Sequence, residues 1–231
     1  MRALLLAAGF GTRLRPLTDA IPKCLVPVRG TPLLEIWLSR LTDSGFGPFL
    51  INTHYLSQVV NAFVNNSRWS QQIQLVNESI LLGTAGTLIR NLDFFQGQDG
   101  LLIHADNYCM ADLAAFKVAH LNRPQGCEIS MLTFRTNNPS SCGVVELDSK
   151  GVVRGFHEKV MNPPGNLANG AVYILSAASL AEIKEKFIEV DDFSIGILPH
   201  FVGRIYSYET KSTFIDIGTP VNYALANLTT D

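Results

Sequence analysis

The sequence has few charged residues, few cysteines and no long apolar run. Charged residues make up 16% of the chain, against about 25% in an average globular domain. The net charge of −2 shows no basic excess that would attract nucleic acid. No apolar run approaches the roughly 20 residues that a membrane-spanning helix needs. The four cysteines form no Cys-x-x-Cys pair, which leaves reduced thiols as the simplest interpretation.

The amino-terminal residues do not resemble a secretion signal. The apolar run from Arg2 to Ala8 is too short for a signal core and continues directly into a glycine-bearing stretch. We therefore expect a cytoplasmic protein with neither a membrane nor a nucleic-acid partner. A homodimer is one option for its oligomeric state.

The apolar residues, 47% of the chain, predict a sizeable core within a single domain over residues 1–231. Up to residue 127, short apolar runs alternate with helical patterns. Strands are expected near 2–8, 49–53, 73–75 and 101–104, and helices near 32–45, 59–64 and 84–92. Pro32 is expected at the first helical position, where its missing N–H costs nothing. This alternation predicts a parallel sheet with helices on both faces.

From residue 128 onward the pattern becomes rich in strands. Strands are expected at 128–135, 143–147, 152–158, 167–174, 205–208 and 213–217, with helices near 177–187 and from 220. Ser179 and Glu182 have the spacing of a capping box. We therefore predict a Rossmann-like, three-layer α/β/α fold with a mixed, mainly parallel sheet and a small β-rich part. Residues 1–127 would bind a nucleotide, and residues 128–231 a second substrate.

A glycine-bearing loop follows the first strand. Residues 9–18 read Gly-Phe-Gly-Thr-Arg-Leu-Arg-Pro-Leu-Thr, and Lys23 comes shortly afterwards. Glycines let the backbone turn sharply, and its N–H groups can then bind a phosphate. Arg13, Arg15 and Lys23 supply cations for the same purpose. An ordinary turn with surface cations is the alternative, since Leu14 replaces the third glycine of the dinucleotide fingerprint.

This combination resembles the signature of the sugar-1-phosphate nucleotidylyltransferases, especially short members that are similar to mannose-1-phosphate guanylyltransferases. The resemblance implies that the loop wraps a nucleotide and that Arg13 and Lys23 hold its phosphates. The expected nucleotide-binding residues are Leu6, Ala7, Ala8, Gly9, Gly11, Thr12, Arg13, Lys23, Glu78, Gly83 and Thr84. The expected catalytic residues are Arg13, Lys23 and Asp106.

Two aspartates are candidates for binding Mg²⁺, the expected cofactor. Asp106 follows a strand at the edge where open α/β sheets bind ligands, and Asp216 lies in an apolar strand before a Gly-Thr-Pro turn. Mg²⁺ takes few protein oxygens and completes its shell with phosphate and water. A cap or turn residue and a salt-bridge partner are the respective alternatives. The family resembles this chain at both aspartates, although Ala105 stands where it usually has glycine.

The resemblance also implies a site for the sugar phosphate in residues 128–231. Glu158 and Lys159 match the Glu-Lys pair that binds the sugar and its phosphate in the family, with Val160 in place of the usual proline. An exposed ion pair is the alternative. Gly143 and Asn169 match the family's sugar-contacting segments more loosely. We expect Gly143, Glu158, Lys159 and Asn169 to bind the sugar phosphate.

The implied reaction joins an NTP and a sugar 1-phosphate into an NDP-sugar and pyrophosphate. GTP is favoured because the Glu78 carboxylate can accept two hydrogen bonds from guanine. Mannose, heptose or a related hexose 1-phosphate is the expected sugar substrate. The alternatives are a UTP-dependent uridylyltransferase, a nucleotide-sugar glycosyltransferase, and a catalytically silent regulator that binds a nucleotide-sugar. A glycosyltransferase would want Asp-x-Asp, which Asp106-Asn107-Tyr108 does not supply.

Two further expectations concern the histidines and the end of the chain. The five histidines form no pattern, so a structural role is expected for each. No acyltransferase or β-helix domain, such as some relatives carry, is expected after the closing helix.

Overall fold

The structure, a computed structural model, describes residues 1–229 and divides the chain into two compact units. Unit 1 consists of residues 1–81, 103–111 and the segment from 212 onward, and unit 2 of residues 82–102 and 112–211. Each unit is therefore assembled from separate stretches of sequence. The functional division into residues 1–127 and 128–231 stays a prediction.

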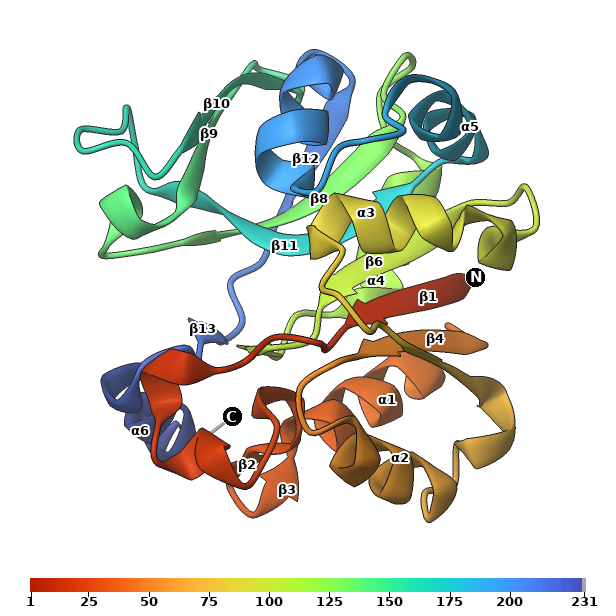
Figure 1. Cartoon of the computed structure of the whole chain (residues 1–231). Helices are drawn as coiled ribbons and strands as arrows, with labels where there is room; N and C mark the ends of the chain where they lie inside the picture. Colours follow the sequence, from red (N-terminus) through yellow and green to blue (C-terminus); the bar gives the residue numbers. More distant parts are fainter. Residues whose placement is uncertain (230–231) are drawn as a thin grey trace. The chain divides into compact units, whose positions relative to one another are not determined.

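Three neighbouring strands of unit 1 run parallel, and the middle one of the three is fully buried. Strand β1 (Arg2–Leu6) pairs in parallel with β4 (Phe49–Thr53), as Figure 1 shows. Strand β4 also pairs in parallel with β5 (Ile73–Asn77). Every residue of β4 is buried. A continuous apolar run is what a strand covered on both faces requires. The carboxyl end of strand β6 (Gly100–His104) belongs to unit 1.

The described part of unit 1 contains three α-helices, namely α1 (Leu33–Asp43), α2 (Ser57–Asn65) and α6 (Pro220–Leu228). Helices α1 and α2 lie on the same side of β4 (Figure 1). The apolar stripe of α1 is buried as expected, and its members are Leu33, Leu34, Trp37, Leu38 and Leu41. The prediction for Pro32 was wrong by one residue: Thr31–Pro32 is strand β3, paired with β2 (Pro27–Val28), and the helix begins after it.

A small two-stranded sheet brings the end of the chain into unit 1. Strand β7 (Asn107–Cys109) pairs in antiparallel fashion with β13 (Phe214–Asp216), with Asp216 opposite Asn107. Helix α6 follows β13, and the Tyr223 hydroxyl donates a 2.8 Å hydrogen bond to the Pro27 carbonyl. The hydrogen bond to Pro27 thus joins the carboxyl-terminal helix to the amino-terminal part of unit 1.

Unit 2 contains most of the antiparallel pairings. Its strands are β8 (Ile129–Arg135), β9 (Gly143–Leu147), β10 (Val153–Glu158), β11 (Leu167–Leu175) and β12 (Ile205–Glu209). Strand β11 pairs with β8 and β9, and β9 forms a hairpin with β10, all antiparallel, whereas β12 runs parallel to β8. In the β9–β10 turn, Oδ1 of Asp148 accepts hydrogen bonds from the backbone of Lys150 and Val152.

The helices of unit 2 are α3 (Gly83–Arg90), α4 (Leu113–Leu121) and α5 (Ala177–Lys186). Helix α4 was not predicted. The capping-box prediction at Ser179 was wrong, because Ser176 caps α5 by accepting a hydrogen bond from the Ser179 N–H. A π-helical turn (Phe193–Ile197) follows further along.

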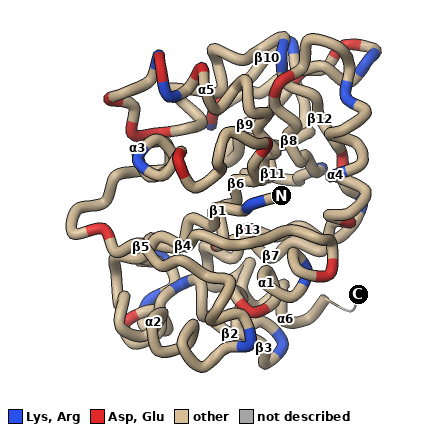
Figure 2. The backbone as a smooth tube through the Cα atoms, turned by 90° about the vertical axis from the view of Figure 1, so that its right-hand side faces the viewer, with Lys and Arg blue, Asp and Glu red and all other residues tan. Residues whose placement is uncertain are grey.

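The predicted fold class, α/β with a mixed, mainly parallel sheet, is confirmed. Basic and acidic residues are interspersed along the trace of each unit (Figure 2), as the near-zero net charge suggests. Within residues 1–229, no helix has both the length and the apolar character that crossing a membrane requires.

Candidate active site

The loop after β1 turns at Gly11. Its φ of +64° lies in the left-handed region, and a Cβ there would come within 3.0 Å of Thr18 Cγ2 and 3.1 Å of Lys23 Cβ. Gly11 therefore starts the 3₁₀ helix Thr12–Leu14, as no other residue could without strain. At Gly9, by contrast, a Cβ would meet no atom within 4 Å. The backbone at Gly9 thus has open space beside it, which the approach of a phosphate group would need.

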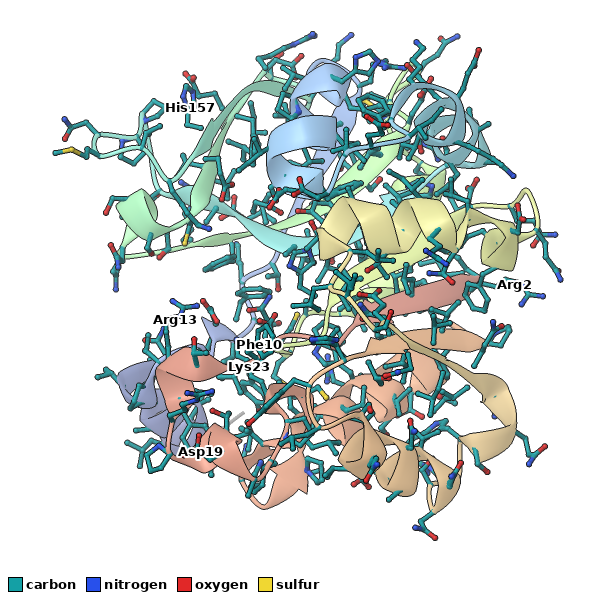
Figure 3. The ribbon with its side chains drawn as sticks, in the orientation of Figure 1. Arg2, Phe10, Arg13, Asp19, Lys23 and His157 are labelled. Carbon is teal, nitrogen blue, oxygen red and sulfur yellow. The ribbon has the colours of Figure 1, made fainter. Side chains whose placement is uncertain are left out.

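The cation and carboxylate residues predicted from sequence meet in unit 1. Lys23 Nζ lies 2.7 Å from Oδ2 of Asp106 and 3.5 Å from Oδ1 of Asp216. The Lys23 side chain is only 8% exposed. Arg13 Nη2 lies 4.0 Å from Oδ2 of Asp216, on a side chain that is 69% exposed. Figure 3 shows Arg13, Lys23 and Phe10 on the same amino-terminal segment.

Asp216 is held in place by the turn that follows it. The Gly218 N–H donates a 2.8 Å hydrogen bond to Oδ1 of Asp216. A Cβ at Gly218 would lie 2.7 Å from Nη2 of Arg13 and 2.8 Å from Oδ1 of Asp216. The glycine therefore lets the guanidinium and the carboxylate approach each other.

Opposing effects act on the pKa of the Asp106 carboxyl. Burial by itself would raise the pKa of its carboxyl, but the Lys23 ammonium and His104 outweigh that effect and lower the pKa below its usual value. The replacement of the family's glycine by Ala105 leaves the adjoining backbone paired, because the buried Ala105 donates its N–H to the Leu6 carbonyl at 3.0 Å. Asp106 is thus an ionised carboxylate directly after β6.

The two carboxylates fit a divalent cation. Both approach one cationic atom, Lys23 Nζ, so their oxygens converge on a common region. Within residues 1–229 no group of three or more His, Cys, Asp or Glu side chains could hold a metal ion. A pair of carboxylates suits Mg²⁺, which takes its remaining ligands from phosphates and water.

Arg15 lies apart from this cluster. Its Nε is 3.2 Å from Oδ1 of Asp19, and both side chains are more than half exposed. The structure thus gives the three loop cations different surroundings. Arg13 and Lys23 contact the aspartates, whereas Arg15 forms a local surface ion pair.

Glu78 is a buried carboxylate in unit 1, only 5% exposed. Its Oε1 accepts a 3.0 Å hydrogen bond from the amide of Asn52. Its carbonyl lies 2.7 Å from Nδ1 of His54, and its N–H donates to the Thr53 carbonyl at 2.8 Å. The side chain of Glu78 is therefore held in place by the fold. Its role toward a nucleobase stays a prediction.

Gly83 and Thr84 begin α3 in unit 2. The φ of Gly83 is +76°, and a side chain there would collide with the backbone of Asp191. Oγ1 of Thr84 accepts a 2.8 Å hydrogen bond from the Phe193 N–H. These contacts explain both residues through packing alone, so their predicted nucleotide contacts rest on the resemblance.

Glu158 and Gly143 lie opposite each other in the β9–β10 hairpin of unit 2. A Cβ at Gly143 would come within 2.5 Å of Oε2 of Glu158, so the glycine leaves room for the carboxylate. Strand β10 ends at Glu158, and Lys159 has a φ of +49°. Lys159 Nζ lies 3.3 Å from Oε1 of Glu158, and its side chain is mostly exposed. The strand thus ends where both side chains can turn toward one ligand.

Asn169 stands at an irregularity in β11, where the register with β8 shifts. Its Oδ1 accepts a 2.9 Å hydrogen bond from the Ala171 N–H, and its Nδ2 donates to the Tyr173 hydroxyl at 2.6 Å. Burial raises the pKa of Tyr173, so the phenol stays protonated. The side chain of Asn169 is therefore held by two internal hydrogen bonds.

Sequence reasoning missed three residues of these surroundings: Asn52, His54 and Gly218. Asn52 and His54 follow a buried apolar run directly, as Asn-Thr-His at the carboxyl end of β4. Polar residues at that edge of a parallel sheet are a signal for a ligand site, and this signal was available. The Asp-Ile-Gly-Thr stretch likewise contained Gly218.

Comparison with known proteins assigns the chain to a family. Residues 2–231 match the family model described as Nucleotidyl transferase. The chain is a member of this nucleotidyl transferase family. The family resemblance inferred from the loop and the two aspartates is thus confirmed.

The relatives found by sequence are longer than this chain. The mannose-1-phosphate guanylyltransferase of Mycobacterium tuberculosis is 30% identical over 225 residues, which cover 96% of this chain and 62% of that protein. The mannose-1-phosphate guanyltransferase of Schizosaccharomyces pombe is 29% identical, with 96% of this chain and 62% of that protein covered. The nucleotidyl transferase chain thus spans 62% of the length of both relatives.

Solved structures have the same fold. HddC from Yersinia pseudotuberculosis, complexed with GMP-PN, superposes with a TM-score of 0.80 at 25% identity and covers 98% of this chain and 97% of that one. A candidate glucose-1-phosphate thymidylyltransferase from Bacillus anthracis, in complex with a sucrose, superposes with a TM-score of 0.85 at 22% identity, covering 98% and 94%. The second likeness establishes the fold alone.

Proposed function

We propose that this nucleotidyl transferase transfers a nucleotidyl group from an NTP to a sugar 1-phosphate and releases pyrophosphate. The observation that carries the proposal is the convergence of Lys23 on Asp106 and Asp216, with Arg13 beside Asp216. Two cations and two carboxylates beside a glycine turn suit a polyphosphate better than a neutral ligand.

The reaction needs no enzyme nucleophile. A phosphate oxygen of the sugar 1-phosphate attacks the α-phosphorus in line, the bond to the bridging oxygen breaks, and pyrophosphate leaves. The residues of the chain act by positioning and by balancing charge. Arg13 and Lys23 would neutralise the phosphate oxygens as charge moves onto the leaving group. Asp106 and Asp216 would hold Mg²⁺, which supplies further charge neutralisation on the phosphates when it is bound.

The loop is the proposed holder of the nucleotide. The residues assigned to this role are Leu6, Ala7, Ala8, Gly9, Gly11 and Thr12, together with Glu78, Gly83 and Thr84. Glu78 would select the base. The four residues proposed for the sugar phosphate are Gly143, Glu158, Lys159 and Asn169.

GTP is the proposed nucleotide, and mannose, heptose or a related hexose 1-phosphate is the proposed acceptor. The names of the two relatives, both mannose-1-phosphate guanylyltransferases, support this choice. So does the GMP-PN in the HddC complex. A UTP-dependent reaction at the same site is the alternative, and the experiment must distinguish it from the GTP-dependent reaction. A homodimer and a cytoplasmic location are kept as proposals.

The test is a measurement of pyrophosphate release over a grid of four NTPs and several sugar 1-phosphates, with and without Mg²⁺. We expect release that requires both substrates and Mg²⁺, is fastest with GTP, and yields an NDP-sugar identified by mass spectrometry. Asp106→Asn serves as the inactive control. Nucleotide binding without turnover for every pair would favour the silent regulator, and transfer of sugar from an NDP-sugar would favour the glycosyltransferase.

A further inference from the structure

Asn52 connects the glycine-bearing loop to Glu78. It lies at the carboxyl end of β4, opposite Leu6 on β1 and Val76 on β5. Its Oδ1 accepts a 2.8 Å hydrogen bond from the Ala7 N–H, and its Nδ2 donates a 3.0 Å hydrogen bond to Oε1 of Glu78. One buried amide therefore joins the ends of three neighbouring strands.

His54 makes a second connection between the same two segments. His54 comes directly after the last residue of β4. Its Nδ1 lies 2.7 Å from the Glu78 carbonyl. The rings of His54 and Phe10 meet edge to face, with their centroids 5.4 Å apart. Phe10 belongs to the loop (Figure 3) and is 44% exposed.

We propose that Asn52 is a positioning residue that holds the Glu78 carboxylate in register with the loop and thereby sets the choice of nucleotide. The proposal rests on the proposed function and deepens it. An amide has a donor and an acceptor on one rigid plane, so it can accept from the Ala7 backbone while it donates to a carboxylate. An aspartate at this position could only accept. Buried hydrogen bonds of this kind are worth most where water is excluded.

A positioning role of Asn52 has different consequences from a merely structural role. If Asn52 only stabilised the fold, its replacement would lower the melting temperature and leave the relative affinity for GTP and UTP unchanged. If it positions Glu78, its replacement changes that ratio and raises the KM for GTP, while the KM for the sugar 1-phosphate stays within about twofold.

The central variant is Asn52→Asp, which keeps the acceptor for Ala7 and places a second carboxylate beside Glu78. We expect the GTP-to-UTP affinity ratio, measured by calorimetry on the full chain, to fall by about tenfold or more. Asn52→Ser, which shortens the side chain and withdraws the amide donor from Glu78 without adding a charge, should shift the ratio in the same direction. Asn65→Asp, on the exposed end of α2, is the matched control and should leave the GTP-to-UTP affinity ratio unchanged.

The double variant Asn52→Asp with Glu78→Gln reverses donor and acceptor. It should recover most of the melting temperature lost in Asn52→Asp, and its nucleotide preference should equal that of Glu78→Gln alone. An unchanged ratio in Asn52→Asp and Asn52→Ser, or strictly additive melting temperatures in the double variant, would overturn the inference. A wild-type chain that binds no nucleotide would overturn the proposed function with it, and that outcome is recognised from the wild type alone.

Discussion

Lys23 Nζ lies 2.7 Å from Oδ2 of Asp106, although the two residues are 83 positions apart in the sequence. The lysine is almost fully buried, and its ammonium also lies 3.5 Å from Asp216. A buried ammonium is stable only when carboxylates pair with it. The same carboxylates are the ones proposed to hold Mg²⁺, so the charge balance of this cluster would affect the binding of both the ion and the phosphates.

The first prediction concerns these carboxylates. Asp106→Asn and Asp216→Asn should each lower kcat by about a hundredfold or more, because each removes charge stabilisation at the transferred phosphate. The steady-state rate of pyrophosphate release as a function of Mg²⁺ concentration measures the effect, and circular dichroism checks the fold.

Asp19→Asn is the matched control, since Asp19 is exposed and its carboxylate forms a surface ion pair with Arg15, apart from the Lys23 cluster. It should retain near-normal turnover. If Asp216→Asn keeps the Mg²⁺ dependence of the wild type, the two-carboxylate model is wrong.

The second prediction separates two lysines. Lys23→Ala should mainly impair the enzyme's use of the NTP, whereas Lys159→Ala should mainly raise the KM for the sugar 1-phosphate. The reason is their surroundings: Lys23 contacts the two aspartates, and Lys159 contacts Glu158 in unit 2. Initial rates with each substrate varied in turn give both KM values. Lys150→Ala, in the β9–β10 turn, is the neutral control, and equal changes in both KM values for both lysines would refute the division.

The fold was predictable wherever one residue pattern dominated a segment. Strand β4 was predicted at its observed bounds because it opens with the apolar run Phe49-Leu50-Ile51, and all five of its residues are buried. Helix α4 was missed because apolar residues occur on most of its sides, including the exposed Val118 and Leu121, so it shows no amphipathic period. The local residue pattern is enough to predict β4, whereas tertiary packing determines α4.

The candidate site was predictable residue by residue but not in its contacts. Asp106 and Asp216 were chosen from their motifs. That both approach Lys23 depends on the pairing of β7 with β13. That pairing joins segments distant in sequence, and no local pattern encodes it. The link from Ala7 through Asn52 to Glu78 was missed for the same reason, since each hydrogen bond crosses between strands.

The third prediction is a loss of stability at mildly acidic pH caused by His120. Its ring is fully buried in unit 2, with Nδ1 2.8 Å from the Ser130 hydroxyl and Nε2 3.3 Å from Asp99. Burial lowers its pKa from 6.5 to about 4, with Arg123 contributing, against the opposing effect of Asp99. The unfolded chain therefore takes up a proton between pH 6.5 and 4 that the folded chain does not. The contribution to stability is complete above pH 6.5 and is lost as the pH falls through that window.

Urea unfolding at pH 7.5 and pH 5 measures this effect. The free energy of unfolding should fall by about 2 kcal/mol more in the wild type than in His120→Asn, because only the wild type has this histidine to titrate. A variant of the partly exposed His157, His157→Asn, should behave as the wild type does. The same decrease in all three proteins would assign the acid sensitivity to other groups.

The last prediction concerns the base. The Glu78 carboxylate can accept hydrogen bonds from both N1–H and the exocyclic amine of guanine, whereas uracil offers one N–H between two carbonyl oxygens. Bidentate recognition of a base discriminates by roughly 1–3 kcal/mol in nucleic-acid readout. Glu78→Gln keeps the size, removes the charge and supplies an N–H₂ donor for a uracil carbonyl. The ratio of kcat/KM for GTP to that for UTP should therefore fall by about tenfold or more. Because Glu78 is buried and anchored by Asn52, the substitution acts on a fixed side chain and not on a mobile one. A ratio that does not move would assign the choice of base to backbone groups such as those at Ala8 or Gly83.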